Sequence, residues 1–218
     1  MDVIVTGTSS GIGAAIARAF LEEGHRVWGI DIAPASIEHP AYEHVQADIC
    51  ADELPELPEL PEPEILVNNA GTLEEADAIA VNLTGTMRFT DRMVTSPRLR
   101  SVLFIASASA RNGAEFPQYV ASKAGIVGYM KNLALALAPR GITCNAISPG
   151  GVITPANSHI LDDEELYRQV LAETLLGKWA DPEEIAELAY FLTVRNRSIT
   201  GEDILVDNGE MLKSNFIW

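Results

Sequence analysis

An apolar run, a glycine-rich turn and a helical pattern follow one another directly at the beginning of this sequence. Residues 2–6 (DVIVT) are apolar and mostly β-branched, and residues 7–13 (GTSSGIG) come next. Residues 14–23 carry apolar side chains at helical spacing and stop at Gly24. A buried strand, a glycine loop and a helix in this order form a unit whose backbone N–H groups can receive a pyrophosphate. The pattern therefore predicts an α/β fold of the Rossmann type.

The glycines of this loop have different expected tasks. Gly7 lets the chain turn, Gly11 lets the backbone approach the phosphates, and Gly13 lets the helix pack closely on the strand. A glycine-rich turn can also be purely structural, so that alternative stays open from the loop alone. The predicted phosphate-binding residues are Gly7, Ser9, Ser10, Gly11, Ile12 and Gly13.

An acidic residue lies at the end of the second apolar run, residues 26–30 (RVWGI), where Asp31 follows. A carboxylate about 20 positions beyond the glycine loop can accept hydrogen bonds from the adenosine ribose hydroxyls and repel a 2′-phosphate. Residues 7–13 and 31–37 contain no Arg or Lys that could pair with such a phosphate. NAD is therefore predicted rather than NADP, although Asp31 could instead only cap a turn.

Strand and helix patterns alternate along the rest of the chain. Strands are predicted at residues 42–47, 65–67, 101–105, 142–147 and 203–206, and helices at 74–94, 117–139, 162–175 and 181–194. This alternation predicts a three-layer fold around a doubly wound parallel sheet of about seven strands. One domain is expected over residues 1–218, with residues 155–180 on the substrate side. Asp48 and Ile49, which follow the third strand, are expected at the adenine pocket.

Two segments have unusual compositions. Residues 51–64 (ADELPELPELPEPE) repeat proline too often for an α-helix, so an extended, polyproline-like crossover is predicted, with Leu54, Leu57 and Leu60 on one side. A proline-rich motif for a protein partner is the alternative. The apolar tail, residues 211–218 (MLKSNFIW), is expected to dock on its own or a neighbouring subunit.

Charge and composition restrict the possible partners and the compartment. The formal net charge is -16 with a pI near 4.5, so the surface repels nucleic acid and anionic membranes. No leader pattern precedes residues 2–6 and no stretch reaches a membrane span, which predicts a cytoplasmic protein. Cys50 and Cys144 show no metal-ligand spacing, so two reduced cysteines and no metal are expected.

A tyrosine and a lysine four residues apart, Tyr119 and Lys123, share one face of the helix predicted at residues 117–139. A nearby ammonium stabilises a phenolate and lowers a phenol pKa from its usual value of about 10. Such pairs also occur by chance on solvated helices. Ser107 and Ser109 follow the strand at 101–105, at the sheet edge where parallel α/β folds bind their ligands.

Taken together, these motifs resemble the short-chain dehydrogenase/reductase family, and the resemblance covers nearly the whole chain. The matching residues are Thr6-Gly7-x3-Gly11-Ile12-Gly13, Asn68-Asn69-Ala70-Gly71, Ser107, Tyr119-x3-Lys123, Pro149-Gly150 through Thr154, and Asp207-Asn208-Gly209 in place of the usual Asp-Gly-Gly. The chain resembles a compact member with shortened loops. One shortened segment lies between Gly71 and Asn82, beside the expected mouth of the active site.

The resemblance implies a set of roles for these residues. Tyr119 would be the general acid or base, Lys123 would lower its pKa and hold the nicotinamide ribose, and Ser107 would hydrogen-bond the substrate oxygen. Asn82 would complete the catalytic set by holding a water that links Lys123 to solvent. The expected substrate contacts are Ser107, Ser109 and Tyr119, and family spacing favours Ser107 over Ser109 as the catalytic serine. Besides Lys123, the remaining implied cofactor contacts are Asn69, Ala70, Gly71, Tyr119, Pro149, Gly150, Val152 and Thr154.

The implied activity is NAD-dependent hydride transfer to or from a secondary alcohol or ketone. A hydroxysteroid or alicyclic alcohol is the first substrate class to test, by analogy alone. The alternatives are a 3-oxoacyl reductase-like enzyme and a non-catalytic dinucleotide-binding regulator. Alkene reduction is disfavoured because enoyl reductases of the wider family space Tyr and Lys further apart. Arg111 is a lone cation near the expected cleft, for which a packing or surface role is favoured over contact with an acidic substrate. Family habit implies a homodimer or homotetramer.

Overall fold

Seven parallel strands form one sheet in the computed structural model, which describes residues 1–51, 60–114 and 116–213. The strands are β1 Asp2–Thr6, β2 Arg26–Asp31, β3 Tyr42–Gln46, β4 Ile65–Asn68, β5 Ser101–Ile105, β6 Thr143–Pro149 and β7 Asp203–Val206. Their spatial order is β3-β2-β1-β4-β5-β6-β7, and all neighbouring pairs are parallel. The predicted doubly wound sheet is confirmed, and its strand order reverses between β1 and β4.

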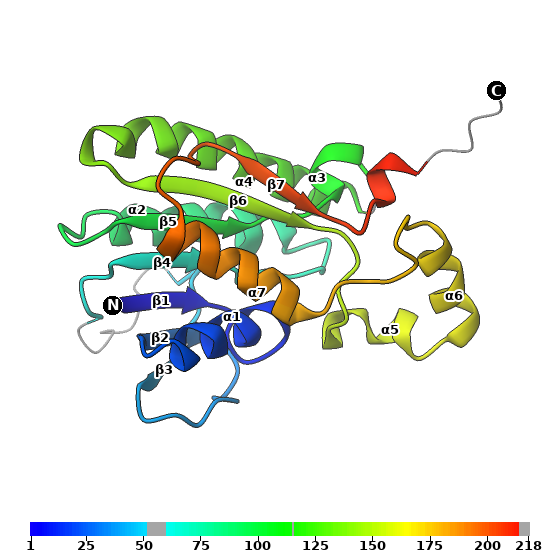
Figure 1. The fold of residues 1–218 in the computed structure, drawn as a ribbon, viewed down its shortest axis with the longest axis horizontal. Coiled ribbons are helices and arrows are strands. Elements are labelled where there is room, and N and C mark those ends of the chain that lie inside the picture. The colour runs from blue at the N-terminus through cyan, green and yellow to red at the C-terminus, as the bar shows by residue number, and fades with distance from the viewer. Residues whose placement is uncertain (52–59, 115, 214–218) are drawn as a thin grey trace.

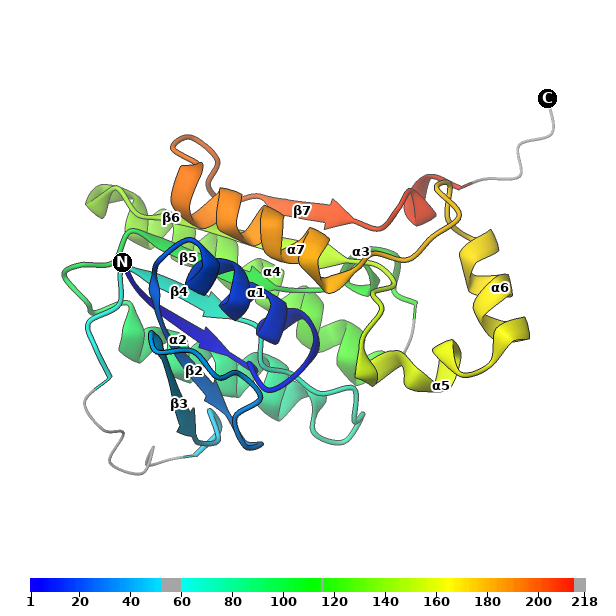
Figure 2. The same ribbon diagram turned by 60° about the horizontal axis from the view of Figure 1, so that its bottom comes forward.

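Helices cover both faces of this sheet. They are α1 Gly11–Glu22, α2 Thr86–Met93, α3 Ser109–Asn112, α4 Pro117–Leu137, α5 Ser158–Leu161, α6 Glu164–Ala172 and α7 Pro182–Tyr190. α1 and α7 pack side by side on one face, whereas α2 and α4 lie on the other (Figure 1). α5 and α6 extend beyond the carboxyl ends of the strands, as both ribbon views show (Figures 1 and 2).

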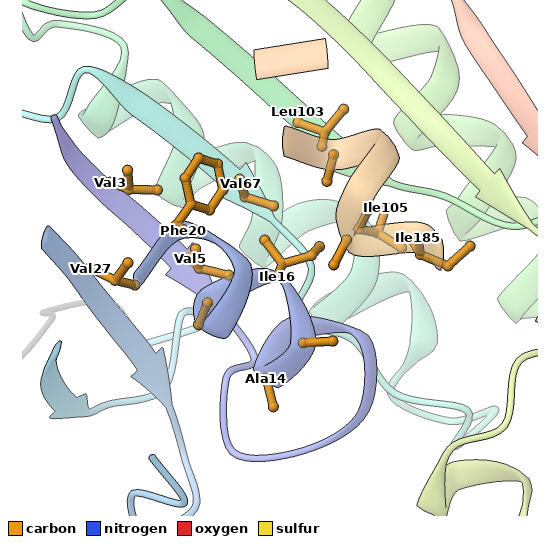
Figure 3. Close-up of a cluster of buried hydrophobic side chains, with 14 of the residues drawn as sticks. Val3, Val5, Ala14, Ile16, Phe20, Val27, Val67, Leu103, Ile105 and Ile185 are labelled. Atoms are coloured by element: carbon orange, nitrogen blue, oxygen red, sulfur yellow. The ribbon is translucent and has the colours of Figure 1, made fainter. Parts of the chain in front are cut away.

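The apolar strands are buried on both faces, which explains their nearly continuous hydrophobic sequences. Val3 and Val5 face the core beneath α1 and α7, whereas Ile4 between them faces the core beneath α2 and α4. Figure 3 shows Phe20 and Ile16 of α1 over the first of these faces. Burying a side chain of this size contributes roughly 1.5–3 kcal/mol, so the core beneath α1 and α7 holds α1 firmly against β1.

Several helix boundaries differ from the prediction. The helix predicted at residues 74–94 begins only at the π-helical run Ile79–Gly85 and continues as α2. Asn82 explains the later start, because its side chain hydrogen-bonds the backbone N–H and C=O of Thr72 and holds the preceding segment as a turn. The helix predicted at 162–175 is present as the shorter α6, which Asp163 caps, and the short α5 before it was not predicted.

The helix predicted at residues 181–194 consists of α7 followed directly by a second π-helical run, Phe191–Arg195. Its predicted start is confirmed by a capping box between Asp181 and Glu184.

Parts of the two unusual segments can be described. Leu60 packs at the edge of the core beneath α2 and α4, whereas Leu54 and Leu57 lie outside the described residues. In the tail, Leu212 is exposed and residues 214–218 lie outside the described part, so docking of the tail stays a prediction. No described helix has the length and apolar character needed to cross a membrane.

Candidate active site

Most of the predicted site residues line one cleft of about 560 Å³ at the carboxyl ends of the strands. The cleft spans the switch point between β1 and β4, where open α/β sheets bind their ligands. The predicted residues that line it are Gly7, Ser10, Gly11, Ile12, Asp31, Asp48, Ile49, Asn69, Ala70, Gly71, Ser107, Tyr119, Lys123, Pro149, Gly150, Val152 and Thr154. Ser9, Gly13, Asn82 and Ser109 lie outside this lining.

The glycine loop has the close approaches expected of it. Gly7 and Gly11 have φ values of 75° and 53°, in the left-handed region that favours glycine. A β-carbon at Gly13 would lie 2.0 Å from the Gly7 oxygen and 2.4 Å from Asn69 Nδ2. Gly13 therefore packs α1 against the loop from behind, which agrees with the task expected of it, while Gly7 and Gly11 face the cleft.

Asn69 and Thr6 join the two loops that meet at the switch point. Asn69 Nδ2 donates to the carbonyls of Thr6 and Gly7 at 3.0 and 3.1 Å. The backbone N–H groups of Asn69 and Ala70 both donate to Thr6 Oγ1 at 3.0 Å. The loop after β4 and the loop after β1 therefore form one rigid floor under the cleft.

The Asp31 carboxylate both caps a turn and lines the cleft. Its Oδ1 accepts from the Ala33 N–H and its Oδ2 from the Ser9 N–H, each at 2.9 Å. Ser9 Oγ donates to the Ala33 carbonyl at 3.3 Å, so Ser9 fixes the wall rather than facing the cleft. The turn-capping alternative for Asp31 is present, and each carboxylate oxygen keeps a further lone pair for a ligand.

Tyr119 and Lys123 lie one turn apart on α4, and both face the cleft. The Lys123 ammonium is 5.7 Å from the centre of the Tyr119 ring. It also donates to the Ile105 carbonyl at the end of β5, at 3.0 Å, and the lysine is only 7% exposed. A buried positive charge is thereby fixed beside the phenol.

Ser107 receives two hydrogen bonds from Ser109. The Ser109 hydroxyl donates to Ser107 Oγ at 2.9 Å, and the Ser109 N–H donates to the same oxygen at 3.2 Å. A serine hydroxyl has two lone pairs and one proton, so the Ser107 proton remains available to a group in the cleft. The structure thus places Ser107 at the wall and Ser109 behind it, 3% exposed.

Asn82 is 2% exposed and lies next to the cleft wall. Its Nδ2 donates to the Thr72 carbonyl at 2.9 Å and to Ser122 Oγ at 3.1 Å, while its Oδ1 accepts from the Thr72 N–H at 2.7 Å. Ser122 Oγ in turn donates to the Tyr119 carbonyl at 2.7 Å. Asn82 therefore connects the turn after Gly71 to the helix that carries Tyr119.

Arg111 has a partner within the fold, and some lining residues were missed. Arg111 is not a lone cation, because its Nε donates to Asp203 Oδ2 at 2.9 Å and ties α3 to β7. Thr72, Asp77 and Val81 line the cleft although no role was predicted for them. The short connection between Gly71 and Asn82 could have predicted these contacts, because a short segment there must stay close to the cleft mouth.

The charged side chains around the described cleft are mostly acidic. Asp31, Asp48 and Asp77 contribute carboxylates, and Lys123 is the cation that the described lining contains. The described residues hold no group of three or more side chains suited to bind a metal ion. Cys144 is fully buried, and burial raises the pKa of its thiol to about 12, so it packs as an inert core residue.

Comparisons with known proteins identify the chain. A family model described as enoyl-(acyl carrier protein) reductase matches residues 61–210, and one described as short chain dehydrogenase matches residues 2–53. A short chain dehydrogenase of Penicillium roqueforti is 31% identical, over 94% of this chain and 95% of the relative. An acetoacetyl-CoA reductase of Paracoccus denitrificans is 34% identical, over 94% and 96%.

Solved structures agree with these sequence matches. The ligand-free aldohexose dehydrogenase of Thermoplasma acidophilum has a TM-score of 0.86 at 28% identity, covering 100% of this chain and 96% of that one. A 4-hydroxyisoleucine dehydrogenase solved with NADH has a TM-score of 0.84 at 26% identity, covering 98% and 99%. An Agrobacterium tumefaciens protein, provisionally assigned as a 2-deoxy-D-gluconate 3-dehydrogenase and solved with NADP, has a TM-score of 0.84 at 25% identity, covering 97% and 96%. The chain belongs to the short-chain dehydrogenase/reductase family of oxidoreductases.

Proposed function

We propose that this protein is an NAD-dependent oxidoreductase that transfers a hydride between the nicotinamide and a secondary alcohol or ketone. The observation that carries the proposal is that Tyr119, Lys123 and Ser107 share one cleft with Asp31 and the glycine loop. This arrangement places acid–base groups beside the residues proposed to hold a dinucleotide. A non-catalytic regulator would have no need of the first three residues.

The cleft floor fits a dinucleotide. A β-carbon at Gly7 would lie 2.7 Å from Asn69 Nδ2 and 2.9 Å from Ala70 Cα, so only bare backbone can occupy this position. Backbone N–H groups at the start of α1 then offer an anion site for the pyrophosphate. When bound, the nicotinamide supplies the hydride chemistry, and the protein orients it. The residues proposed to hold the dinucleotide are Gly7, Ser10, Gly11, Ile12, Asp31, Asp48, Ile49, Asn69, Ala70, Gly71, Pro149, Gly150, Val152 and Thr154.

The acidic lining supports NAD rather than NADP. Asp31 and two further carboxylates surround the cleft, and among its described lining residues there is no arginine to receive a 2′-phosphate. A phosphate beside these carboxylates would be repelled, whereas ribose hydroxyls can donate to Asp31. The structural neighbours were solved with NADH in one case and NADP in another, so the preference rests on this chain's own charges.

Proton transfer is proposed for Tyr119. The fixed ammonium of Lys123 favours the ionised phenol, which prepares Tyr119 to accept a hydroxyl proton in oxidation and to return it in reduction. Ser107 donates its proton toward the substrate oxygen, because its lone pairs are already engaged by Ser109. Charge that develops on that oxygen is thereby stabilised.

The proposed role of Asn82 is to hold a water beside Lys123. A β-carbon at Gly71 would lie 2.9 Å from Asn82 Oδ1 and 3.5 Å from Lys123 Nζ, so both groups approach the same glycine. Asn82 Oδ1 keeps one lone pair after accepting from Thr72. A water between these groups would connect the Lys123 ammonium to solvent.

A neutral secondary alcohol is the substrate class that the charges favour. A coenzyme A thioester carries several phosphates, and the described cleft has three carboxylates against one lysine. The second candidate, a 3-oxoacyl reductase, is favoured by the acetoacetyl-CoA reductase relative. Tyr119 and Lys123 are separated by three residues, which supports carbonyl chemistry over the alkene reduction named in one family model.

A screen for alcohol oxidation tests the proposal. The purified chain is incubated with NAD or NADP and a panel of secondary alcohols, hydroxysteroids, polyols and 3-hydroxyacyl thioesters, and formation of the reduced cofactor is followed by absorbance. Turnover with NAD and a neutral alcohol is expected. Turnover with NADP and 3-hydroxyacyl thioesters alone would instead establish the reductase alternative.

A further inference from the structure

A chain of hydrogen-bonded side chains lies behind Asp31, at the edge of the sheet formed by β2 and β3. Thr8 Oγ1 is 2.9 Å from the Tyr42 hydroxyl, which is 3.0 Å from His44 Nδ1. His44 Nε2 is 3.0 Å from the carbonyl of Ala33. The chain therefore runs from the glycine loop to the turn that immediately follows Asp31. None of the roles proposed above uses it.

The chemistry of the partners fixes the direction of these bonds. A carbonyl oxygen only accepts, so His44 Nε2 carries a proton and donates to Ala33. In the neutral imidazole Nδ1 then accepts from the Tyr42 hydroxyl, and the Tyr42 oxygen accepts from Thr8. Burial raises the pKa of Tyr42, and the hydrogen bond with Thr8, which acts in the opposite direction, does not cancel this effect, so the phenol keeps its proton.

Space for this chain is provided by a glycine in the middle of a strand. Gly29 of β2 lies opposite His44 of β3 in the sheet register. A β-carbon at Gly29 would lie 2.1 Å from the Tyr42 hydroxyl and 2.4 Å from Thr8 Oγ1. Glycine weakens a strand interior, so its presence here is explained by the two hydroxyls that occupy the place of its side chain.

The chain ends on the residue that orients Asp31. The Ala33 carbonyl accepts from both His44 Nε2 and Ser9 Oγ, while the Ala33 N–H donates to Asp31 Oδ1 at 2.9 Å. Gln46, the next residue on this face of β3, donates to the carbonyl of Ile32 at 3.0 Å. His44 and Gln46 of β3 therefore fix the backbone of the turn at residues 32–33, and this turn fixes the Asp31 carboxylate.

We infer that His44 is a positioning residue for the Asp31 carboxylate, acting through Ala33, and thereby sets the affinity for the adenosine ribose of the cofactor. The inference rests on the proposed NAD dependence, because that proposal gives Asp31 its ligand. His44 does not touch the ribose. It keeps the carboxylate oriented before the cofactor arrives, which removes an ordering cost from binding.

Affinity for NADH, measured by isothermal titration, tests this inference without any turnover. His44→Phe keeps a ring but removes both hydrogen bonds, and the dissociation constant is expected to rise about tenfold. His44→Gln can still donate to Ala33 and is expected to restore affinity to within about twofold of wild type. His39→Phe is the matched control, because His39 is exposed and its side chain bonds only the nearby Ala41 N–H among the described contacts.

A double-mutant cycle separates positioning from general damage. If His44 acts through Asp31, then His44→Phe should weaken NADH binding in the wild type but change it less than twofold in an Asp31→Ala background. The inference would be overturned if the fold-changes in the NADH dissociation constant of the two single variants multiplied in the double variant. It would also be overturned if His44→Phe bound NADH with wild-type affinity. If His44→Phe does not fold, Tyr42→Phe replaces it in the same cycle, because it breaks the chain one link earlier.

Failure of the proposed function gives a different result. A wild-type protein that binds NADPH more tightly than NADH would contradict the NAD proposal, whatever the His44 variants do. Tight NADH binding that is lowered by Asp31→Ala but unaffected by His44→Phe would contradict only the role of His44.

Discussion

The Ser109 hydroxyl donates a hydrogen bond to Ser107 Oγ across 2.9 Å, from a position behind the cleft wall. Ser109 thereby orients the Ser107 hydroxyl, which faces the cleft, although Ser109 does not line the cleft. This relationship separates two serines that have the same local sequence context, and it predicts different consequences for their removal.

Ser107→Ala should lower kcat by about 10²–10³, the effect typical of removing one donor to a developing oxyanion. Ser109→Ala should lower kcat by about tenfold or less, because Ser107 keeps its proton but loses one of the bonds that orient it. Steady-state kinetics measure both changes, with the exposed Ser36→Ala as control. Equal losses of kcat for Ser107→Ala and Ser109→Ala would contradict the role of Ser107 as the donor to the substrate oxygen.

Asp31→Ala should increase the use of NADP relative to NAD. The substitution removes the carboxylate that repels a 2′-phosphate and that can accept from the ribose hydroxyls. The ratio of kcat/KM values for the two cofactors measures the change, and Asp162→Ala, an exposed aspartate away from the cleft lining, is the control. An unchanged ratio would remove the electrostatic basis of the NAD proposal.

Local patterns predicted β1, β4, β5 and β6 well because these strands are buried almost throughout and therefore carry mostly apolar residues. The same patterns could not place Arg111, whose partner Asp203 is 92 residues away and meets it only in the folded sheet. The late helix start at Ile79 depends on Asn82 reaching back to Thr72, which helical periodicity does not reveal. The roles of Ser109 and His44 likewise depend on where their side chains point in the folded protein, which the spacing of residues along the sequence does not reveal.

Gly13→Ala should destabilise the protein and weaken NADH binding. The added β-carbon would meet the Gly7 oxygen at 2.0 Å, and backbone must shift to relieve the overlap at a cost of about 1–3 kcal/mol. Gly128→Ala is the matched control, because a β-carbon there meets nothing within 4 Å inside α4 and should stabilise by roughly 0.4–1 kcal/mol. Urea unfolding measures both, and equal stability of the two variants would contradict the predicted packing.

Tyr129 should make the protein sensitive to alkaline pH. Burial, reinforced by the hydrogen bond to Asp91 Oδ1 at 2.6 Å, raises the pKa of Tyr129 above its usual value. A raised folded-state pKa contributes stability that is complete below the unfolded value of about 10 and is lost as the pH rises above it. The difference in unfolding free energy between wild type and Tyr129→Phe should therefore narrow from pH 8 to pH 11. A difference that stays constant over this range would show that Tyr129 ionises equally in both states.

Tyr119 is proposed to transfer the proton in a cleft that binds the dinucleotide without help from the Tyr119 hydroxyl. Tyr119→Phe removes only the hydroxyl, and Tyr167→Phe is the control, because Tyr167 packs against Trp179 outside the cleft lining. NADH affinity and turnover are measured on the same preparation of each variant. Turnover of Tyr119→Phe should fall by about 10²–10⁴ while its dissociation constant for NADH stays within about twofold of wild type. Turnover at the wild-type rate in Tyr119→Phe would contradict proton transfer by Tyr119.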